Sequence, residues 1–345
     1  MPPKSGPRKK VFVTRAIDPA ALVRLRGAAT VSVWDEEMPP PRSTLRAAMA
    51  DADAVLSMVT DKIDARMIAD APRLRVISNL AVGVDNIDLE ASTRAGIAVG
   101  HTPGVLTEAT ADLAFGLLMA TARRIAEADR HVRAGKWRTW GPMTMLGRDV
   151  HSSTLGLIGF GAIGQAMARR AIGFGMRLLY LMHPSGKRKP VRDVQLAGAF
   201  GVSLRRLLVQ SDYVSIHVPL TAKTRHMIGA SEFALIKPGA ILINTARGAV
   251  VDQAAMVAAL KSGRLGGAGL DVTDPEPIAR RDPLLRLNNV VITPHIGSAS
   301  IAARASMAAI AVDNILAAFS GRVPRWCANP QVRLRPRKTQ PEADH

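Results

Sequence analysis

A glycine pattern in the middle of the chain constrains the fold more than any other feature. The stretch GLIGFGAIGQ places Gly159, Gly161 and Gly164 in the spacing G-x-G-x-x-G, after an apolar run and before a helix-compatible segment. In that setting Gly159 permits a tight turn, Gly161 lets a pyrophosphate approach the backbone, and Gly164 allows close packing of helix on strand. The pattern therefore predicts a βαβ unit with a dinucleotide site at a helix N-terminus.

Short β-rich runs alternate with helical segments along the chain, which is typical of doubly wound parallel sheets. In the first hundred residues we expect strands at 10–13, 31–34, 54–57, 75–78 and 97–100, with helices at 61–69 and 89–94. A second series has strands from 154 and at 177–181, 213–218, 240–244, 267–271 and 290–293, and a helix at 298–319 follows it. Between the two series, one long helix is expected over residues 109–135.

Composition limits the setting in which the chain works. Its 345 residues suffice for two domains without disulfides, and the single cysteine, Cys327, fits a reducing compartment. The longest apolar runs fall short of the roughly 18 residues that span a bilayer. We therefore expect a soluble, cytoplasmic protein that does not bind membranes.

The formal net charge of +18 raises the question of nucleic-acid binding. Much of that charge lies at the two ends, in residues 1–10 and 322–338, which contain basic residues and prolines but no acid. Such segments are typical of solvated tails, not of a structured recognition face. The sequence thus disfavours nucleic acid as the partner, and the remaining positive surplus suits a small anion.

The residues that follow the second strand of the glycine unit bear on cofactor choice. An NAD site usually has Asp or Glu about 20 residues after the glycines, to bind the adenosine ribose. His183 stands at that place, and Ser185, Lys187 and Arg188 follow it. These side chains could bind a 2′-phosphate, so NADP(H) is the preferred cofactor and NAD(H) a possible one. The alternative is that the basic stretch is only a solvated loop.

Three later segments each follow a predicted strand: INTARG at 243–248, GLDVTDPEP at 269–277 and VITPHIGSAS at 291–300. They place Arg247, Glu276 and His295 at the carboxyl ends of strands, the edge where ligands bind in open α/β sheets. Periodicity alone does not show whether the three side chains meet. The histidines are not spaced as metal ligands, so no metal is expected.

These motifs in this order resemble the D-2-hydroxyacid dehydrogenases, and most closely the glyoxylate/hydroxypyruvate reductases. The resemblance spans about residues 10–325 and includes AVGVDNIDLEAS at 81–92 and ATADLAFGLLMATAR at 109–123. It implies a flavodoxin-like substrate domain split between residues 1–104 and 299–345. It also implies a Rossmann cofactor domain at 105–298, including an inter-domain helix and a dimerisation arm, with the active site in the cleft between the domains.

The resemblance also implies roles for individual residues. Arg247 would clamp the substrate carboxylate, His295 would donate a proton to the keto oxygen, and Glu276 would orient the imidazole. The backbone N–H groups of Val82 and Gly83 would receive the substrate carboxylate. The predicted cofactor contacts are Phe160, Gly161, Ala162, Ile163, His183, Pro184, Ser185, Lys187, Arg188, Thr245, Ala246, Asp271 and Gly297. Asp271 would meet the nicotinamide carboxamide, or alternatively it only caps a strand end.

The segment WRTWGPM at 137–143 resembles an arm that crosses to a partner subunit in this family. Trp140 would then close the substrate pocket of the neighbouring chain in a homodimer. The alternative is a tryptophan buried in its own subunit.

The implied function is NAD(P)H-dependent reduction of glyoxylate or hydroxypyruvate to the D-2-hydroxy acid. A rival within the family acts on a larger acid, such as phosphoglycerate or an aryl or branched-chain acid. The shape of the pocket near Leu56, Met58, Val82 and Trp140 would decide between them. A rival of another class is a dinucleotide-sensing corepressor that shares the fold and binds protein partners.

Overall fold

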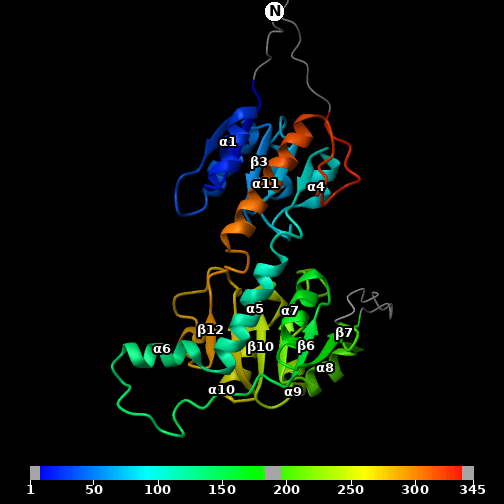
Figure 1. The fold of residues 1–345 in the computed structure, drawn as a ribbon. Coiled ribbons are helices and arrows are strands. Elements are labelled where there is room, and N and C mark those ends of the chain that lie inside the picture. The colour runs from blue at the N-terminus through cyan, green and yellow to red at the C-terminus, as the bar shows by residue number, and fades with distance from the viewer. Residues whose placement is uncertain (1–7, 183–195, 336–345) are drawn as a thin grey trace, which may run out of the picture. The chain divides into compact units, whose positions relative to one another are not determined.

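The computed structural model describes residues 8–182 and 196–335, which divide into two compact units (Figure 1). The first comprises Met1–Val105 and Ser300–His345, and the second comprises Leu106–Ala299. Each is built on one sheet, of five and of seven strands, in which every neighbouring pair of strands is parallel. The predicted α/β fold class is therefore confirmed.

The sheet of the first unit has the strand order β2-β1-β3-β4-β5, the flavodoxin-like order. Its strands are β1 (Lys10–Val13), β2 (Thr30–Val33), β3 (Ala54–Ser57), β4 (Val76–Asn79) and β5 (Ala98–Gly100). The helices are α1 (Pro19–Ala28), α2 (Arg42–Asp51), α3 (Ala65–Ala69), α4 (Leu89–Arg94) and α11 (Ile301–Phe319). The predicted strands lie within one residue of the observed ones.

Helices cover both faces of this sheet, which explains why β3 and β4 are buried at every position. Helices α2, α3 and α4 contribute to one apolar cluster with the strands. Helix α11 packs against β3, β4 and β5. By length and composition α11 could cross a membrane. Its buried face, which includes Met307, Ala311 and Ile315, makes it the core helix of this unit.

The second unit has the strand order β12-β11-β10-β9-β6-β7-β8. The strands are β6 (Thr154–Ile158), β7 (Arg177–Leu181), β8 (Phe200–Val202), β9 (Tyr213–Ile216), β10 (Ala240–Asn244), β11 (Leu265–Leu270) and β12 (Val290–Ile292). From β6 the chain builds outward to β7 and β8, and it then returns to place β9 on the other side of β6. The strand order therefore reverses between β6 and β9, and ligands bind at such a point in open α/β sheets.

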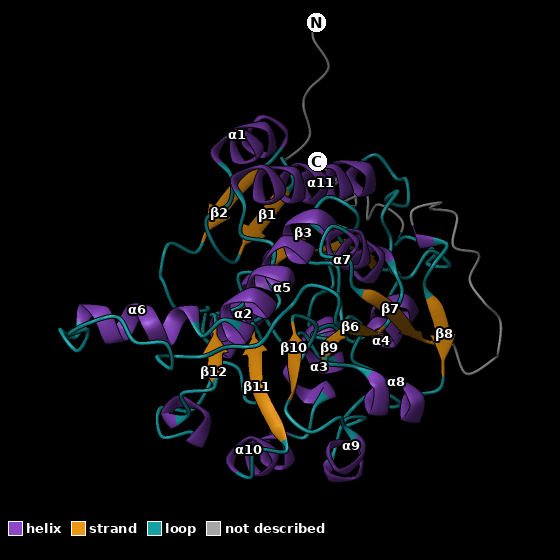
Figure 2. Ribbon diagram, turned by 60° about the horizontal axis from the view of Figure 1, so that its bottom comes forward, coloured by secondary structure: helices purple, strands orange, loops and turns teal. Residues whose placement is uncertain are grey.

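Two layers of helices enclose the second sheet (Figure 2). Helices α5 (Thr107–Ala122) and α7 (Ala162–Ile172) share one apolar cluster with it. Helices α8 (Leu204–Gln210), α9 (Ala230–Leu235) and α10 (Gln253–Lys261) share the other. Two 3₁₀ turns, Gly248–Val250 and Pro283–Arg286, complete the unit together with α6 (Ile125–Arg133).

The long helix expected over residues 109–135 is wrong, because the structure has two helices there. Helix α5 ends at Ala122 and α6 begins at Ile125. Arg124 between them has a left-handed φ of 55°, and its guanidinium donates two 2.8 Å hydrogen bonds to Glu127. No glycine or proline marks the break, so the sequence pattern continues through it. The edge strand β8 was also not predicted.

The expectation of a solvated tail at 322–338 is wrong for the described part, which ends at Arg335. Asn329 is 1% exposed, and its side chain bonds to Val99 N and Ile97 O in the first unit. Arg335 donates to the carbonyl oxygens of Ala95 and Ala71. Asn329 and Arg335 thus hold the chain end against the first unit, while Arg322, Arg325 and Arg333 remain exposed.

Candidate active site

The glycine loop lies between β6 and α7, beside the point where the strand order reverses. Gly159 has a φ of +104°, and a Cβ added to it would lie 2.6 Å from the carbonyl oxygen of His217. A Cβ on Gly164 would lie 2.1 Å from Gly159 O, so the helix can approach the strand only without a side chain there. A Cβ on Gly161 would meet nothing within 4 Å. The open space lies at Gly161, where the sequence predicts the pyrophosphate.

The neighbours of this loop complete an anion-binding surface. Gly161 is the N-cap of α7 and no side chain caps that helix, so its first N–H groups suit phosphate oxygens. Ala162 and Ile163 form the first turn of α7. The ring of Phe160 stacks on Tyr180 of β7, with centroids 4.4 Å apart, which places the ring against the neighbouring strand. His183, Pro184, Ser185, Lys187 and Arg188 lie outside the described residues.

His217 supports the glycine loop from the end of β9. Its imidazole Nε2 lies 2.9 Å from Ser215 Oγ. The backbone N–H of His217 donates to Ile158 O. Burial lowers the pKa of His217 to about 4, because the charged imidazolium would lose its hydration there. His217 is therefore neutral at physiological pH and is a structural residue.

The loop after β10 carries Arg247. The buried side chain of Asn244 accepts from Ala246 N at 3.0 Å and donates to Arg247 O at 2.9 Å, which fixes the turn. The Arg247 guanidinium donates to Ala246 O at 2.8 Å. Thr245 Oγ1 is buried with no hydrogen-bond partner among the described residues. A buried hydroxyl without a partner is costly, and a bound ligand could satisfy it.

The loops after β11 and β12 are held together by one buried carboxylate. Asp271 is 1% exposed and accepts from Thr293 Oγ1 at 2.6 Å, Ile296 N at 2.8 Å and Gly297 N at 2.7 Å. These contacts are those of a residue that anchors the loop following β12. Thr293 was not predicted as a site residue; only its place just after a strand pointed to it.

His295 lies within the loop that Asp271 anchors, in a left-handed backbone conformation with a φ of 55°. Such a conformation is uncommon for a residue with a side chain and costs on the order of 1 kcal/mol or more. Its N–H donates to Asp271 O at 2.9 Å, which helps to hold the conformation. The strained backbone points to a functional role for the side chain that it presents.

The structure brings His295 and Glu276 into direct contact. His295 Nδ1 lies 2.5 Å from Glu276 Oε1, and both side chains remain partly exposed. With Nδ1 bound to the carboxylate, the proton on Nδ1 is fixed and Nε2 is left to exchange a proton with a ligand. The Arg247 loop adjoins the loop that carries Glu276, since a Cβ on Gly248 would lie 2.0 Å from Thr273 O. Three neighbouring strands thus present their loops at one edge of the sheet.

Comparisons with known proteins agree with this arrangement. The family model "D-isomer specific 2-hydroxyacid dehydrogenase, NAD binding domain" matches residues 115–297, more than half of the chain. A glyoxylate reductase of Korarchaeum cryptofilum is 49% identical over 95% of this chain and 98% of its own length.

The chain belongs to the D-2-hydroxyacid dehydrogenase family.

Solved structures show the same similarity across both units. A protein from Thermus thermophilus has a TM-score of 0.86 and 46% identity, covering 92% of this chain and 99% of its own. The NADPH-dependent glyoxylate/hydroxypyruvate reductase of Sinorhizobium meliloti, in complex with NADP and malonate, has a TM-score of 0.81 and 32% identity, covering 95% and 99%. The protein is accordingly an NAD(P)-dependent oxidoreductase that reduces small 2-keto acids, and the predicted family membership is confirmed.

In the first unit of this dehydrogenase, the loop after β4 carries Val82 and Gly83. Their N–H groups have no acceptor within the parts of the chain that the structure describes. Val82 is 38% exposed, whereas Leu56 is wholly buried within β3. Leu56 therefore cannot line a substrate pocket as expected, while Val82 is accessible.

The segment that follows α6 is the most exposed apolar part of the dehydrogenase. Trp140 is 77% exposed, and Trp137, Met143 and Leu146 are each more than half exposed. No residue of α6 is buried, and Figures 1 and 2 show α6 extending away from the sheet of its unit. The alternative that Trp140 is buried in its own subunit is wrong.

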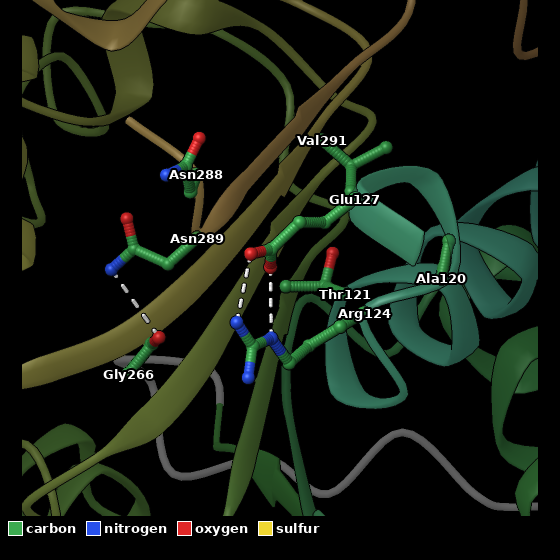
Figure 3. A pocket seen from close by; sticks show the side chains of 8 residues that line it. All are labelled: Ala120, Thr121, Arg124, Glu127, Gly266, Asn288, Asn289 and Val291. Carbon is green, nitrogen blue, oxygen red and sulfur yellow. Dashed lines mark hydrogen bonds and ion pairs between the residues drawn. The ribbon is translucent and has the colours of Figure 1, made fainter. Parts of the chain in front are cut away.

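A small cavity of about 280 Å³ lies elsewhere in the second unit (Figure 3). It is lined by Ala120, Thr121, Arg124, Glu127, Gly266, Asn288, Asn289 and Val291. Gly266 is near the start of β11 and Asn289 precedes β12, so the cavity adjoins the amino ends of the strands. It is therefore separate from the edge that carries His295.

Proposed function

We propose that the protein reduces glyoxylate or hydroxypyruvate to the D-2-hydroxy acid and prefers NADPH. The observation that carries this proposal is the contact between His295 and Glu276 at the carboxyl edge of the dinucleotide-binding sheet. The relatives named as glyoxylate reductases support the choice of substrate. Their names and their coverage of the whole chain give no support to a corepressor.

The residues at this edge divide the chemistry between them. A nicotinamide cofactor, when bound, would supply the hydride for the keto carbon. Arg247 holds the substrate carboxylate by a bidentate pairing and polarises the keto oxygen. His295 transfers the proton of Nε2–H to that oxygen as the carbon–oxygen double bond becomes a single bond. Glu276 holds the ring in place and stabilises its protonated form, and His295 then regains a proton from water.

The second unit offers the groups that a dinucleotide needs. The open face of Gly161 and the uncapped start of α7 would hold the pyrophosphate. Thr245, Ala246 and Gly297 would line the nicotinamide half of the dinucleotide. There the ligand would give a hydrogen-bond partner to the buried hydroxyl of Thr245, which has none among the described residues. The carboxylate of Asp271 accepts three hydrogen bonds and could accept one more, which the nicotinamide carboxamide N–H would donate.

The preference for NADPH rests on the residues after β7. The absence of an acid at His183 removes a charge that would repel a 2′-phosphate, and Lys187 and Arg188 supply positive charge nearby. The first unit would serve as the substrate domain. There Val82 and Gly83 would receive the substrate carboxylate.

We further propose a homodimer in which Trp140 reaches the substrate pocket of the partner subunit. The exposed apolar surface of residues 137–146 supports a partner of some kind, because a lone soluble chain seldom leaves so many large apolar side chains in water. Trp140→Ala should raise the KM for the keto acid while the dimer persists. A monomer with full activity, identified by sedimentation, would refute the proposal. A cytoplasmic location stays a prediction.

The test is to follow oxidation of NADPH and NADH separately against a panel of 2-keto acids. We expect the highest kcat/KM with glyoxylate or hydroxypyruvate and NADPH, and a smaller gap between cofactors in the Lys187→Ala, Arg188→Ala double variant. A higher kcat/KM with NADH in the native protein would overturn the cofactor preference. A clear preference for phosphonooxy, aryl or branched-chain acids would instead favour the rival substrate class.

A further inference from the structure

We propose that His101 is a positioning residue that aims the peptide N–H of Gly83 at the substrate carboxylate. This inference rests on the proposed function, because it assumes that Val82 and Gly83 receive that carboxylate. His101 Nδ1 lies 2.9 Å from the carbonyl oxygen of Val82. That oxygen can only accept, so Nδ1 must carry the hydrogen and act as the donor.

The geometry of a peptide bond turns this contact into control of the neighbouring N–H. The Val82 carbonyl and the Gly83 N–H belong to the same planar trans peptide, so they point in opposite directions. Fixing the carbonyl toward His101 therefore fixes the N–H away from it. Gly83 has no side chain to restrict the peptide, so an external donor has to set its orientation.

The same device is repeated along the loop. Thr102 N donates to Ala81 O at 2.7 Å, and the Asn79 side-chain amide donates to Gly83 O at 3.0 Å. Three consecutive carbonyl oxygens are thus each bound from the body of the first unit. The N–H groups of Val82 and Gly83 are left without acceptors among the described residues. Successive backbone N–H groups without acceptors can bind an anion such as a carboxylate.

His101 is itself held in place by the chain around it. Its N–H donates to Trp326 O at 3.0 Å, and its carbonyl oxygen accepts from the Asn314 side chain at 3.1 Å. Asn314 is 2% exposed and approaches so closely that a Cβ on Gly100 would lie 2.7 Å from its amide nitrogen. The backbone of His101 is therefore held by helix α11 and by the chain that follows it, which fixes the position from which the ring reaches Val82 O.

The test uses two substitutions of nearly the same shape. His101→Asn keeps an N–H donor on the atom attached to Cγ, at about the place of Nδ1. His101→Leu puts a methyl group there and leaves no donor. We expect His101→Leu to raise the KM for the keto acid and the inhibition constant for malonate about tenfold, the usual scale for one lost hydrogen bond. The KM for the dinucleotide and the melting temperature should change little.

His101→Asn should restore both constants to within about threefold of native values, since the lost bond is remade. If the two variants behave alike, or if KM for the dinucleotide rises with that for the keto acid, His101 has no positioning role. Should His101→Leu unfold, His101→Ala, which also lacks the donor, takes its place in the comparison with His101→Asn. If the native protein reduces none of the 2-keto acids, the proposed function is wrong. If the native protein is active and His101→Leu leaves the KM for the keto acid unchanged, only this inference is wrong.

Discussion

Two histidines of the second unit stand at the same edge of one sheet and have opposite properties. His295 follows β12, remains partly exposed and has its Nδ1 bound to the carboxylate of Glu276. His217 follows β9, its imidazole is hydrogen-bonded to the hydroxyl of Ser215, and burial lowers its pKa to about 4. The environments thus differ, because a carboxylate orients the partly exposed imidazole of His295, whereas burial keeps His217 neutral near neutral pH.

The largest expected effect comes from making the same substitution at both histidines. His295→Gln removes the proton donor, so kcat should fall by about 10² to 10⁴-fold, the scale of general acid catalysis. His217→Gln removes a group that stays neutral, and kcat should change by no more than about threefold. Steady-state kinetics at saturating cofactor measures both values, with cofactor binding checked by fluorescence. Equal losses in the two variants would abolish the distinction between the histidines.

The anchor of the His295 loop offers the next largest effect. Asp271→Ala leaves the hydroxyl of Thr293 and the N–H groups of Ile296 and Gly297 without their acceptor. We expect a loss of about 3 kcal/mol in the free energy of unfolding, since the acceptor is charged and buried. Denaturant unfolding measures that loss, and kcat should fall at least tenfold as His295 loses its position.

The isosteric variant Asp271→Asn serves as the control for this anchor. It keeps one oxygen acceptor and should lose less stability than Asp271→Ala. A rise in the KM for the dinucleotide in this variant would indicate that Asp271 also contacts the cofactor. Unchanged stability and kcat in both variants would show that the loop does not depend on Asp271.

Much of this arrangement was predictable because the residues that specify it are local in sequence. The strands were found from short apolar runs, and the glycine spacing located the loop between β6 and α7. Arg247, Glu276 and His295 could be assigned to strand ends, but their order along the chain carries no distance. The pairing of His295 with Glu276 joins residues 19 positions apart, and only folding shows it.

The features that the sequence did not predict depend on single contacts. The break between α5 and α6 occurs at Arg124, a good helix former, and Glu127 pairs with it there. The strand β8 is three residues long with a glycine at its centre, so it gives little periodic signal. His101 was set aside because it lacked metal-ligand spacing, and a bond to a backbone carbonyl leaves no mark on sequence pattern. Asp271 was expected at the cofactor, and the donors to its side chain among the described residues all lie in the loop after β12.

The low pKa of His217 should make stability depend on pH. At pH 8 the ring is neutral in both the folded and the unfolded protein. In the unfolded chain the imidazole takes up a proton below about pH 6.5, whereas in the folded protein it does so only below about pH 4. The free energy of unfolding therefore falls as the pH falls between those values. Lost stability from this residue should reach on the order of 2 kcal/mol at pH 5.

Comparison with His217→Gln isolates this contribution, since glutamine does not titrate in that range. Denaturant midpoints at pH 8 and pH 5 give the change for each protein. The native protein should lose more stability than the variant on going to pH 5. Equal losses would mean that the imidazole titrates normally, in which case His217 and His295 would not differ in the way described.

The smallest expected effect is a loss of stability on removing the hydroxyl of Ser215, which is hydrogen-bonded to His217. A second buried serine, Ser211, provides a matched control. Ser215→Ala removes the hydroxyl that is hydrogen-bonded to the buried imidazole of His217, and it should cost about 1 kcal/mol at pH 8. Ser211 is equally buried, but its hydroxyl has no partner there, so Ser211→Ala should be neutral or slightly stabilising. Because both changes delete one oxygen from a buried serine, the difference between their midpoints reports the hydrogen bond itself. A difference near zero would mean that desolvation alone, without help from Ser215, keeps His217 neutral and in place beneath the glycine loop.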